Sequence, residues 1–495
     1  MISELKRAPR PRSVPVLAIL IAAGIAALEP AYAQPEEEEE EEELLRERLT
    51  ERVDRRRPPK PNSVDIAGRP LTVTGEYAFE LNYLRDAASQ PSPGPRLVLE
   101  QGPEMESFYT FGPALSLFAA VNFGARSDLL NGSSSSDRVF LERGEMWVYS
   151  QPLAGVPFSL EAGRLHFEDD RRWWWDEERD AVRTEFDLGA FGFVLALARE
   201  LAPETTTTGG IAPEEDGVVR TFAEASWDWH PDHEIELFFL HQHDGSDTEP
   251  VGAIVSPSNT DESDAQLSWL GLRLSGAFES RGGHVAGYWL DVGRVFGEEW
   301  IVEYSEQSAT ASVVDSKRRT DVEGWGSDVG VGWIMPYRLE PRIYAAYAFG
   351  SGDSLPDDGT DRSYRQTGLQ NNEAGFGGAE RFNAYGVLLE PELSNLSVLT
   401  LGTGVRLLRS SSLDLVYHRY RLDEPATELR DANIQTNLNG IDRTFGEEVD
   451  LVLALEEWER FEVQFRASAF KAGPAFGAAE GDWSYSGFLA LKLLF

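Results

Sequence analysis

The sequence predicts an all-β protein, a transmembrane β-barrel of about 18 antiparallel strands. Three observations support this fold class. Segments of roughly ten residues alternate between apolar and polar side chains, with period two, from Leu71 to the end of the chain. Long and short connections between these segments alternate. The chain also begins with an export signal and ends with an aromatic strand residue, Phe495, which is typical of bacterial outer-membrane barrels.

Residues 1–33 are predicted to be a cleaved signal peptide. Four basic residues precede the apolar run Val14–Leu28, and the small residues Ala31 and Ala33 have the spacing of a cleavage site. After Leu28, no apolar stretch reaches the roughly 18 residues of a transmembrane helix. The chain is therefore expected to leave the cytoplasm and, if it crosses a membrane, to cross it with strands.

Residues 34–68 are predicted to be a charged periplasmic leader that is partly disordered. Glu36–Glu43 are consecutive glutamates, and such runs are solvated. The charged segment that follows could form a short helix ending before Pro58. A docking segment for a periplasmic partner is the alternative reading of this leader.

Residues 69–495 are predicted to form the barrel. In Phe461–Phe470 the apolar residues occupy one face, while Glu462, Gln464 and Arg466 occupy the other. The strand 483–495 shows the same alternation. The expected strands are 71–85, 95–108, 114–126, 138–150, 157–167, 180–188, 191–200, 218–229, 234–243, 264–278, 283–293, 326–336, 341–350, 396–408, 412–420, 446–456, 460–470 and 483–495.

The connections fix the expected orientation. Short turns such as Gly189–Ala190 and His230–His233 belong at the periplasmic end, and the long connections 201–217, 244–263, 294–325, 351–395 and 421–445 belong outside. We place 351–395 in one long loop that folds into the lumen, although 381–390 could be a further strand. The loops 127–137, 351–395 and 421–445 are candidate gates.

The charge balance restricts the ligand class. The formal net charge is −39 and cysteine is absent, so nucleic-acid binding and a disulfide framework are both excluded. A local basic channel is compatible with an acidic protein. We expect the acids to concentrate in the loops and the leader and the lumen to be locally positive.

Five sequence blocks in order resemble the alginate export porins, which are barrels of eighteen strands. The blocks are Gly163–Arg183, Ser363–Gly378, Leu389–Gly402, Leu413–Arg421 and Gly446–Gly477, and the resemblance covers the chain from about Leu71 to Phe495. It implies export of an anionic polysaccharide through a lumen that contains arginines and carboxylates. The resemblance carries over Arg164, Asp176, Asp180, Arg183, Arg365, Gln366, Arg381, Arg419 and Arg466 as charged or polar groups along this pathway.

Two positions depart from the family pattern. Gln464 stands where the family has a second arginine beside Arg466, and Gly144 stands where the family can have arginine, next to Arg143. Arginine suits a uronate because its planar guanidinium pairs with a carboxylate in bidentate fashion. The alternative reading is that these charges form ion pairs that only brace the barrel.

The block Trp173, Trp174 and Trp175 is interpreted as an aromatic girdle at the lipid headgroups or the channel mouth. A sugar-stacking platform is the alternative. His230 and His233 lie too far along a strand from His241 and His243 to share a metal ion, so no metal or other cofactor is expected.

The sequence contains none of the common hydrolase or nucleotide-binding motifs, so it predicts a channel rather than an enzyme. The expected partners are an anionic polysaccharide, the lipid and lipopolysaccharide of a Gram-negative outer membrane, and possible periplasmic export proteins. A diffusion porin that takes up small acidic solutes is the alternative function.

Overall fold

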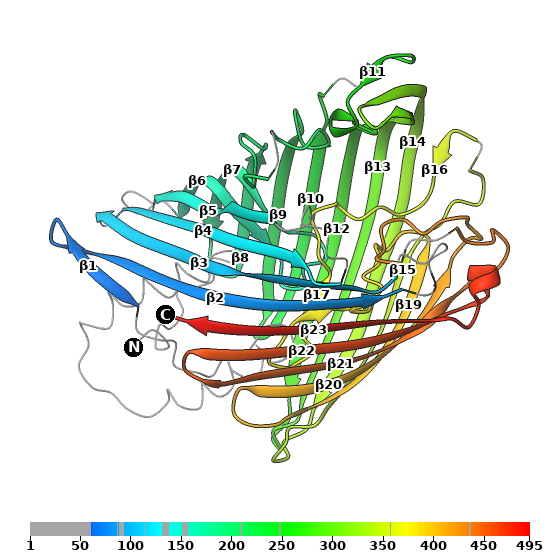
Figure 1. The fold of residues 1–495 in the computed structure, drawn as a ribbon. Coiled ribbons are helices and arrows are strands. Elements are labelled where there is room, and N and C mark those ends of the chain that lie inside the picture. Colours follow the sequence, from blue (N-terminus) through cyan, green and yellow to red (C-terminus); the bar gives the residue numbers. More distant parts are fainter. Residues whose placement is uncertain are drawn as a thin grey trace.

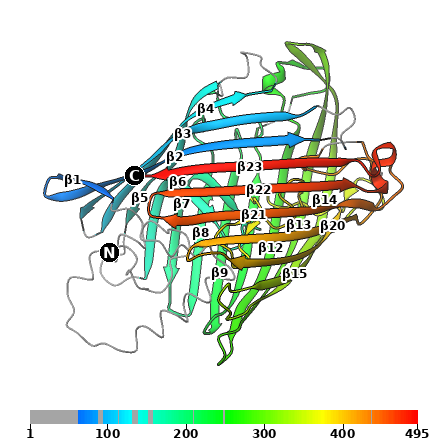
Figure 2. The same cartoon turned by 60° about the horizontal axis from the view of Figure 1, so that its bottom comes forward.

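The computed structural model describes residues 61–495 except 87, 89–93, 113, 131–137, 151–156, 208–209, 247–248, 357 and 435–436. The predicted signal peptide and the leader up to residue 60 lie outside these residues. One sheet of 21 strands contains the barrel and three short added strands, β1 (Asn62–Ile66), β11 (Ile254–Val255) and β16 (Thr360–Asp361). All its pairings are antiparallel except that of β16 with β14. The remaining 18 strands close on themselves because β2 pairs with both β3 and β23. Figure 2 shows β23 between β2 and β22 at this closure.

The barrel strands follow the predicted order. They are β2 (Arg69–Arg85), β3 (Arg96–Gly112), β4 (Leu115–Asp128), β5 (Arg138–Ser150), β6 (Phe158–Glu168), β7 (Asp176–Asp187), β8 (Phe191–Ala198), β9 (Val219–His230), β10 (His233–His243), β12 (Ser263–Glu279), β13 (Val285–Ser308), β14 (Ala311–Ile334), β15 (Arg342–Gly350), β19 (Leu396–Arg406), β20 (Ser411–Leu422), β21 (Thr444–Trp458), β22 (Phe461–Ala472) and β23 (Trp483–Leu494). The two short helices are 3-10 turns, η1 (Pro257–Asn259) and η2 (Pro474–Ala479). None of the helices among the described residues is long and apolar enough to span a membrane.

The alternation read from the sequence separates an outer from an inner face. On β10, Leu237 is 53% exposed on the outer face, while its neighbour Phe238 is 2% exposed on the inner face. On β12, Leu270 is exposed and Trp269 is buried in the same way. Each strand therefore presents one apolar face outward, as a barrel in a bilayer requires.

The connection 294–325 was expected to be a loop, and this expectation is wrong. β13 and β14 pair continuously from Val285 with Ile334 to Ser308 with Ala311, interrupted only by two bulges. Figure 1 shows this hairpin rising beyond its neighbours. Arg319 forms an ion pair with Glu298 across it. The segment has no apolar alternation because an extension that leaves the membrane needs no apolar face, and the sequence pattern therefore resembles a loop.

Segment 351–395 folds into the lumen, as predicted. It contains two short strands, β17 (Glu373–Ala374) and β18 (Phe382–Asn383), which pair with each other and not with the barrel. The candidate strand 381–390 thus contributes only β18. Figure 1 shows the segment, in yellow, running between the walls. We call it the lumen loop.

A second insertion into the lumen was not predicted. β6 and β7 pair over their whole length, from Phe158 with Phe186 to Glu168 with Asp176. Pairing of β5 with β6 stops at Arg164, and pairing of β7 with β8 stops at Ala181. The upper half of this hairpin therefore leaves the wall. Its tip, residues 169–175, packs against the inner face of β10, β12 and β13, where Trp174 contacts Phe238.

The leader was predicted to extend to residue 68, and its described end differs from this prediction. Asn62–Ile66 form β1, which pairs with Arg69–Val73 of β2. Ala67 and Gly68 make the turn, and both have positive φ. The ordered part of the chain therefore includes a hairpin at the short-turn end of the barrel, in which β1 is fully exposed.

Candidate functional site in the barrel lumen

The hairpin tip, the lumen loop and β22 meet at a group of opposed charges that we call the lumen junction. Arg172 binds Glu168 at 2.8 Å and Glu373 at 2.9 Å. The other two arginines are tied to the same carboxylates, because Arg381 lies 3.0 Å from Glu168 and Arg466 lies 3.8 Å from Glu373. The junction comprises Arg172, Arg381, Arg466, Glu168, Glu373 and Glu380.

The three arginines of the lumen junction keep contact with solvent. Their side chains are 22%, 13% and 16% exposed for Arg172, Arg381 and Arg466, respectively. Two of them were predicted from the sequence as pathway residues. Arg172 was not, because its place depends on the inward bend of the hairpin, which the sequence pattern does not reveal.

The tip that carries Arg172 is held by the carboxylate of Asp169. This group accepts hydrogen bonds from the backbone N–H groups of Arg171, Trp174 and Trp175 at 2.7–3.1 Å. It also forms an ion pair with Arg273 of β12 at 2.6 Å. The backbone donors of a tight turn are thereby satisfied by one side chain inside the barrel.

The girdle interpretation of the three tryptophans is wrong. Trp173, Trp174 and Trp175 are 2%, 1% and 4% exposed, and they face the lumen side of the wall. Trp174 stacks on Phe238 at 5.0 Å and occupies the space that a side chain at Gly271 would fill. The rings anchor the tip, and their buried faces leave no platform on which a sugar could stack. The three adjacent rings fill space on several sides of the tip.

Arg365 and Gln366 hold the lumen loop in place. Arg365 forms ion pairs with Glu299 of β13 at 2.5 Å and with Asp361 at 2.7 Å. The Gln366 side-chain amide donates to the carbonyl oxygen of Trp173 at 3.3 Å. Both predicted residues thus lie inside the barrel, where they join the loop to the wall and to the hairpin tip.

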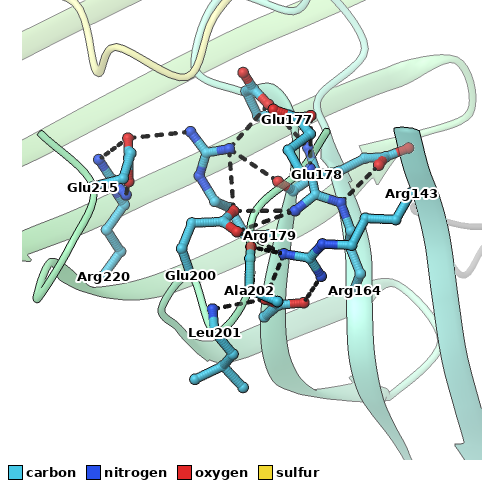
Figure 3. A network of polar contacts seen from close by, with 12 residues as sticks. Arg143, Arg164, Glu177, Glu178, Arg179, Glu200, Leu201, Ala202, Glu215 and Arg220 are labelled. Carbon is cyan, nitrogen blue, oxygen red and sulfur yellow. Dashed lines mark hydrogen bonds and ion pairs between the residues drawn. The ribbon is translucent and has the colours of Figure 1, made fainter. Parts of the chain in front are cut away.

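Arg164 lies in a charged cluster at the point where the hairpin leaves the wall (Figure 3), and Asp180 belongs to the same cluster through its ion pair with Arg143. Arg164 binds Glu178 at 3.0 Å and Glu200 at 3.1 Å. Arg143 binds the same Glu200 at 2.9 Å and Asp180 at 2.6 Å. Because the arginines are saturated by carboxylates and largely buried, this cluster braces the gap between β5 and β6.

Arg183 and Asp176 also have internal partners. Arg183 is buried and forms ion pairs with Glu161 and, at 3.4 Å, with Glu185. Asp176 lies 2.8 Å from His166 and 3.2 Å from Arg172. These contacts favour the alternative reading, in which the charges form ion pairs that brace the barrel. Asp176 also borders the lumen junction.

Arg419 is not a lumen residue, and this prediction is wrong. On β20 the neighbours His418 and Tyr420 are buried on the inner face, so Arg419 points outward. It pairs in register with Leu399, which is exposed on the outer face of β19. A one-residue difference in strand parity moves a side chain to the opposite face.

The expectation that the acids concentrate in loops and leader is wrong for one inner wall. Glu104 interacts electrostatically with Glu76, Glu106 and Glu178, and the exposed outer-face residue Met105 shows that Glu104 and Glu106 point inward. The connected acids are Glu76, Glu80, Glu100, Glu104, Glu106, Glu142, Glu145 and Glu178. The lumen therefore has an acidic wall, and it lies beside the lumen junction, because Glu80 interacts electrostatically with Arg466.

One group of side chains has the spacing of metal ligands. Ligand atoms of His166, Glu168 and Asp176 lie within 4.8 Å of one another. Arg172 binds both carboxylates, at 2.8 and 3.2 Å. Its guanidinium supplies the positive charge that a cation would bring, so the group forms an ion-pair network with its own counter-charge.

The base of the lumen loop contains a carboxyl group with a shifted pKa. Burial raises the pKa of Glu392, while Arg430 and the backbone N–H of Gln366 act in the opposite direction. Arg430 lies 3.3 Å away and the N–H of Gln366 donates at 2.6 Å. The neutral form of Glu392 is therefore favoured in the folded protein relative to a free glutamate.

A protein-family model described as alginate export matches residues 115–488. The chain belongs to this alginate export family. It is 26% identical over 383 residues to "Alginate production protein AlgE" of Pseudomonas aeruginosa, covering 72% of this chain and 75% of that protein. It is 24% identical to the protein of the same name in Pseudomonas syringae pv. tomato, covering 67% and 71%.

Solved structures with the same fold are outer-membrane barrels. The outer membrane protein OprD of Pseudomonas aeruginosa superposes with a TM-score of 0.52 at 9% identity, covering 86% of this chain and 93% of that chain. OccD3 (OpdP) of the same organism gives a TM-score of 0.53 at 11% identity, covering 89% and 95%. The predicted fold class and family are confirmed, and the protein is a β-barrel of the outer membrane.

Proposed function

We propose that this member of the alginate export family is a channel through which an anionic, alginate-like exopolysaccharide leaves the cell by passive translocation. Membership of the family, over most of the chain, is the observation that carries the proposal. The family's members are channels, and a channel role needs no catalytic group. In this proposal lipid and lipopolysaccharide would surround the barrel, and periplasmic export proteins would supply the polymer.

The lumen junction supports an anionic substrate. Its three arginines are partly exposed, whereas Arg164 and Arg183 have side chains only 1% and 4% exposed. A guanidinium can exchange one carboxylate partner for another at little cost, because the hydrogen bonds are of the same kind. A uronate passing the junction can therefore replace Glu168 or Glu373 as the partner of an arginine.

The protein's own carboxylates also explain release. Conduction needs sites that are favourable enough to enter and weak enough to leave. Glu168 and Glu373 compete with the substrate for the same arginines, so no uronate is held for long. The acidic wall beside the junction would repel a polyanion and so further limit how long it stays at the arginines.

The proposal is tested by single-channel recording in planar bilayers with polymannuronate added to either side. We expect the polymer to block wild-type currents. In the variant Arg381→Gln/Arg466→Gln we expect the affinity of the blocking polymer to fall roughly tenfold or more, because a hydrogen bond to a charged group contributes more binding free energy than a neutral one. Arg419→Gln is the matched control, since this arginine faces outward.

Two outcomes would contradict the proposal. Absence of block in the wild-type protein would remove the polyanion as substrate. Rapid flux of small acidic solutes without block by the polymer would favour the diffusion porin instead.

A further inference from the structure

A polar cleft lies at the end of the barrel that carries the long loops. Its volume is about 510 Å³, which is within the range of small-ligand sites. Three parts of the chain form it: the extended β13–β14 hairpin, the two ends of the lumen loop, and the loop between β20 and β21. Its lining residues include Arg318, Thr320, Ser363, Asn395, Glu428 and Arg430. We call it the outer cleft.

Arg318 faces the inside of the barrel mouth. It pairs in register with Ile301, two positions from the pair of Glu299 with Thr320. Glu299 binds Arg365 of the lumen loop, so this face of the hairpin is the inner one. The Arg318 guanidinium donates to the Thr320 hydroxyl at 3.2 Å, and among the described residues it has no carboxylate within ion-pair distance. Arg318 is thus a solvent-exposed cation directed into the cleft.

Arg430 supplies a second cation from the loop between β20 and β21. Its side chain is 48% exposed, and its Nε atom lies 3.3 Å from Glu392. Only this one contact occupies the guanidinium among the described residues. The terminal nitrogens of Arg430 therefore remain available to a ligand carboxylate.

The acids of the outer cleft are mostly engaged elsewhere. Asp361 accepts from Arg365 at 2.7 Å, and Asp353 lies 3.5 Å from Arg362. Glu428 is exposed at the cleft. The cleft thus offers two incompletely paired arginines against one such carboxylate.

The rest of the lining suits a sugar. Hydroxyl groups of Ser363, Ser394 and Thr427 border the cleft, next to the apolar surfaces of Ile301 and Pro356. Hydroxyl groups can donate to and accept from sugar hydroxyls, and apolar surfaces can cover the C–H faces of a pyranose ring. This combination of cations, hydroxyls and small apolar surfaces is unlike the acidic wall deeper in the lumen.

We propose that the outer cleft is an exit subsite that binds a short stretch of uronate residues through Arg318 and Arg430. The inference rests on the proposed function and extends it to a specific place at the outer mouth. The emerging chain is held there by two carboxylate contacts, one from the β13–β14 hairpin and one from the loop between β20 and β21. Glu428 opposes this binding and promotes release into the medium.

The test is block of single channels by a short oligouronate, added separately to the outer or the inner side of the full chain in a planar bilayer. We expect Arg318→Gln/Arg430→Gln to weaken block from the outer side at least roughly tenfold, because two charge-assisted contacts are lost. Block from the inner side should change far less, since the lumen junction is intact. A neutral oligosaccharide of equal length serves as the ligand control.

The variant Glu428→Gln should have the opposite effect to the arginine variant. Block from the outer side should become stronger, because the carboxylate that opposes uronate binding is removed. This exposed residue has no ion-pair partner among the described residues, so the substitution leaves the packing intact. The arginine variants are checked for the heat-modifiable gel mobility of a folded barrel.

The outcomes separate the subsite from the channel function. Equal outer-side block in wild-type protein, the double arginine variant and Glu428→Gln would overturn the exit subsite while leaving the channel function in place. Absence of block from either side in wild-type protein would overturn the proposed function itself. Equal block by the neutral oligosaccharide would show that the cleft does not select carboxylates and would also overturn the subsite.

Discussion

Replacing Trp174 by alanine should release the hairpin tip from the lumen wall without opening the barrel. The ring is 1% exposed, stacks on Phe238 at 5.0 Å and meets Trp173 edge-on at 4.7 Å. The ring also fills the space beside Gly271 and Gly293, so its removal leaves a cavity between the tip and the wall. Truncation of a buried aromatic residue to alanine costs about 3–5 kcal/mol.

This cost translates into a large change in local opening. At about 1.4 kcal/mol per tenfold, 3–5 kcal/mol raises the open population by roughly a hundred-fold to a few thousand-fold. The backbone N–H groups of Trp174 and Trp175 donate to Asp169 only when the tip is docked. Their hydrogen exchange therefore reports the docking equilibrium.

The assay is hydrogen exchange followed by mass spectrometry of the segment that contains residues 169–176. We expect protection of this segment to fall by the stated factor in Trp174→Ala. The matched control is Trp227→Ala, whose ring is 44% exposed on the outer face. If exchange of the tip is the same in Trp174→Ala and wild type, the tip is not held by this ring and our account of the tryptophan block is wrong.

Three further expectations follow from the described contacts. Arg183→Gln leaves the buried Glu161 without its counter-charge, so unfolding in urea should require about 3–5 kcal/mol less free energy, whereas the double variant with Glu161→Gln should recover part of that loss. The raised pKa of Glu392 means that the folded state holds its proton more tightly. Protection at the base of the lumen loop, corrected for intrinsic exchange rates, should therefore be greatest below the ordinary pKa near 4.5 and fall as the pH rises; Glu392→Gln should flatten this dependence. Arg466→Gln should shift the ion selectivity of single channels toward cations, and Arg419→Gln should leave selectivity unchanged; equal shifts would contradict the assignment of their faces.

The period-two pattern predicted the strands, and together with the export signal, the aromatic last residue and the alternating connection lengths it predicted the barrel. The pattern is visible in the sequence because each strand must present apolar side chains to the membrane on one face and polar side chains on the other. This constraint acts on every strand separately, so it can be read locally. It fails where both faces meet water, and the β13–β14 extension was therefore read as a loop. The wrong placement of Arg419 came from the family resemblance and not from this pattern, because the alternation along β20 itself puts Arg419 on the outer face.

The candidate site was only partly predictable. Arg365, Gln366, Arg381 and Arg466, which the resemblance to the alginate export porins implied as pathway residues, lie inside the barrel. Their partners come from distant parts of the chain, such as Glu299 for Arg365. No local pattern indicates which carboxylate an arginine will meet.

The sequence by itself determined the strand order, the closure at Phe495 and the presence of a loop in the lumen, since these follow from side-chain alternation and connection length. Only the tertiary structure decided that the β6–β7 hairpin bends inward. That bend depends on Trp174 filling the space above Gly271 and Gly293, two glycines about a hundred residues away. The fit of these side chains depends on residues that are far apart in the sequence, so no local pattern reveals it. This packing in turn decides which charged side chains face the pore.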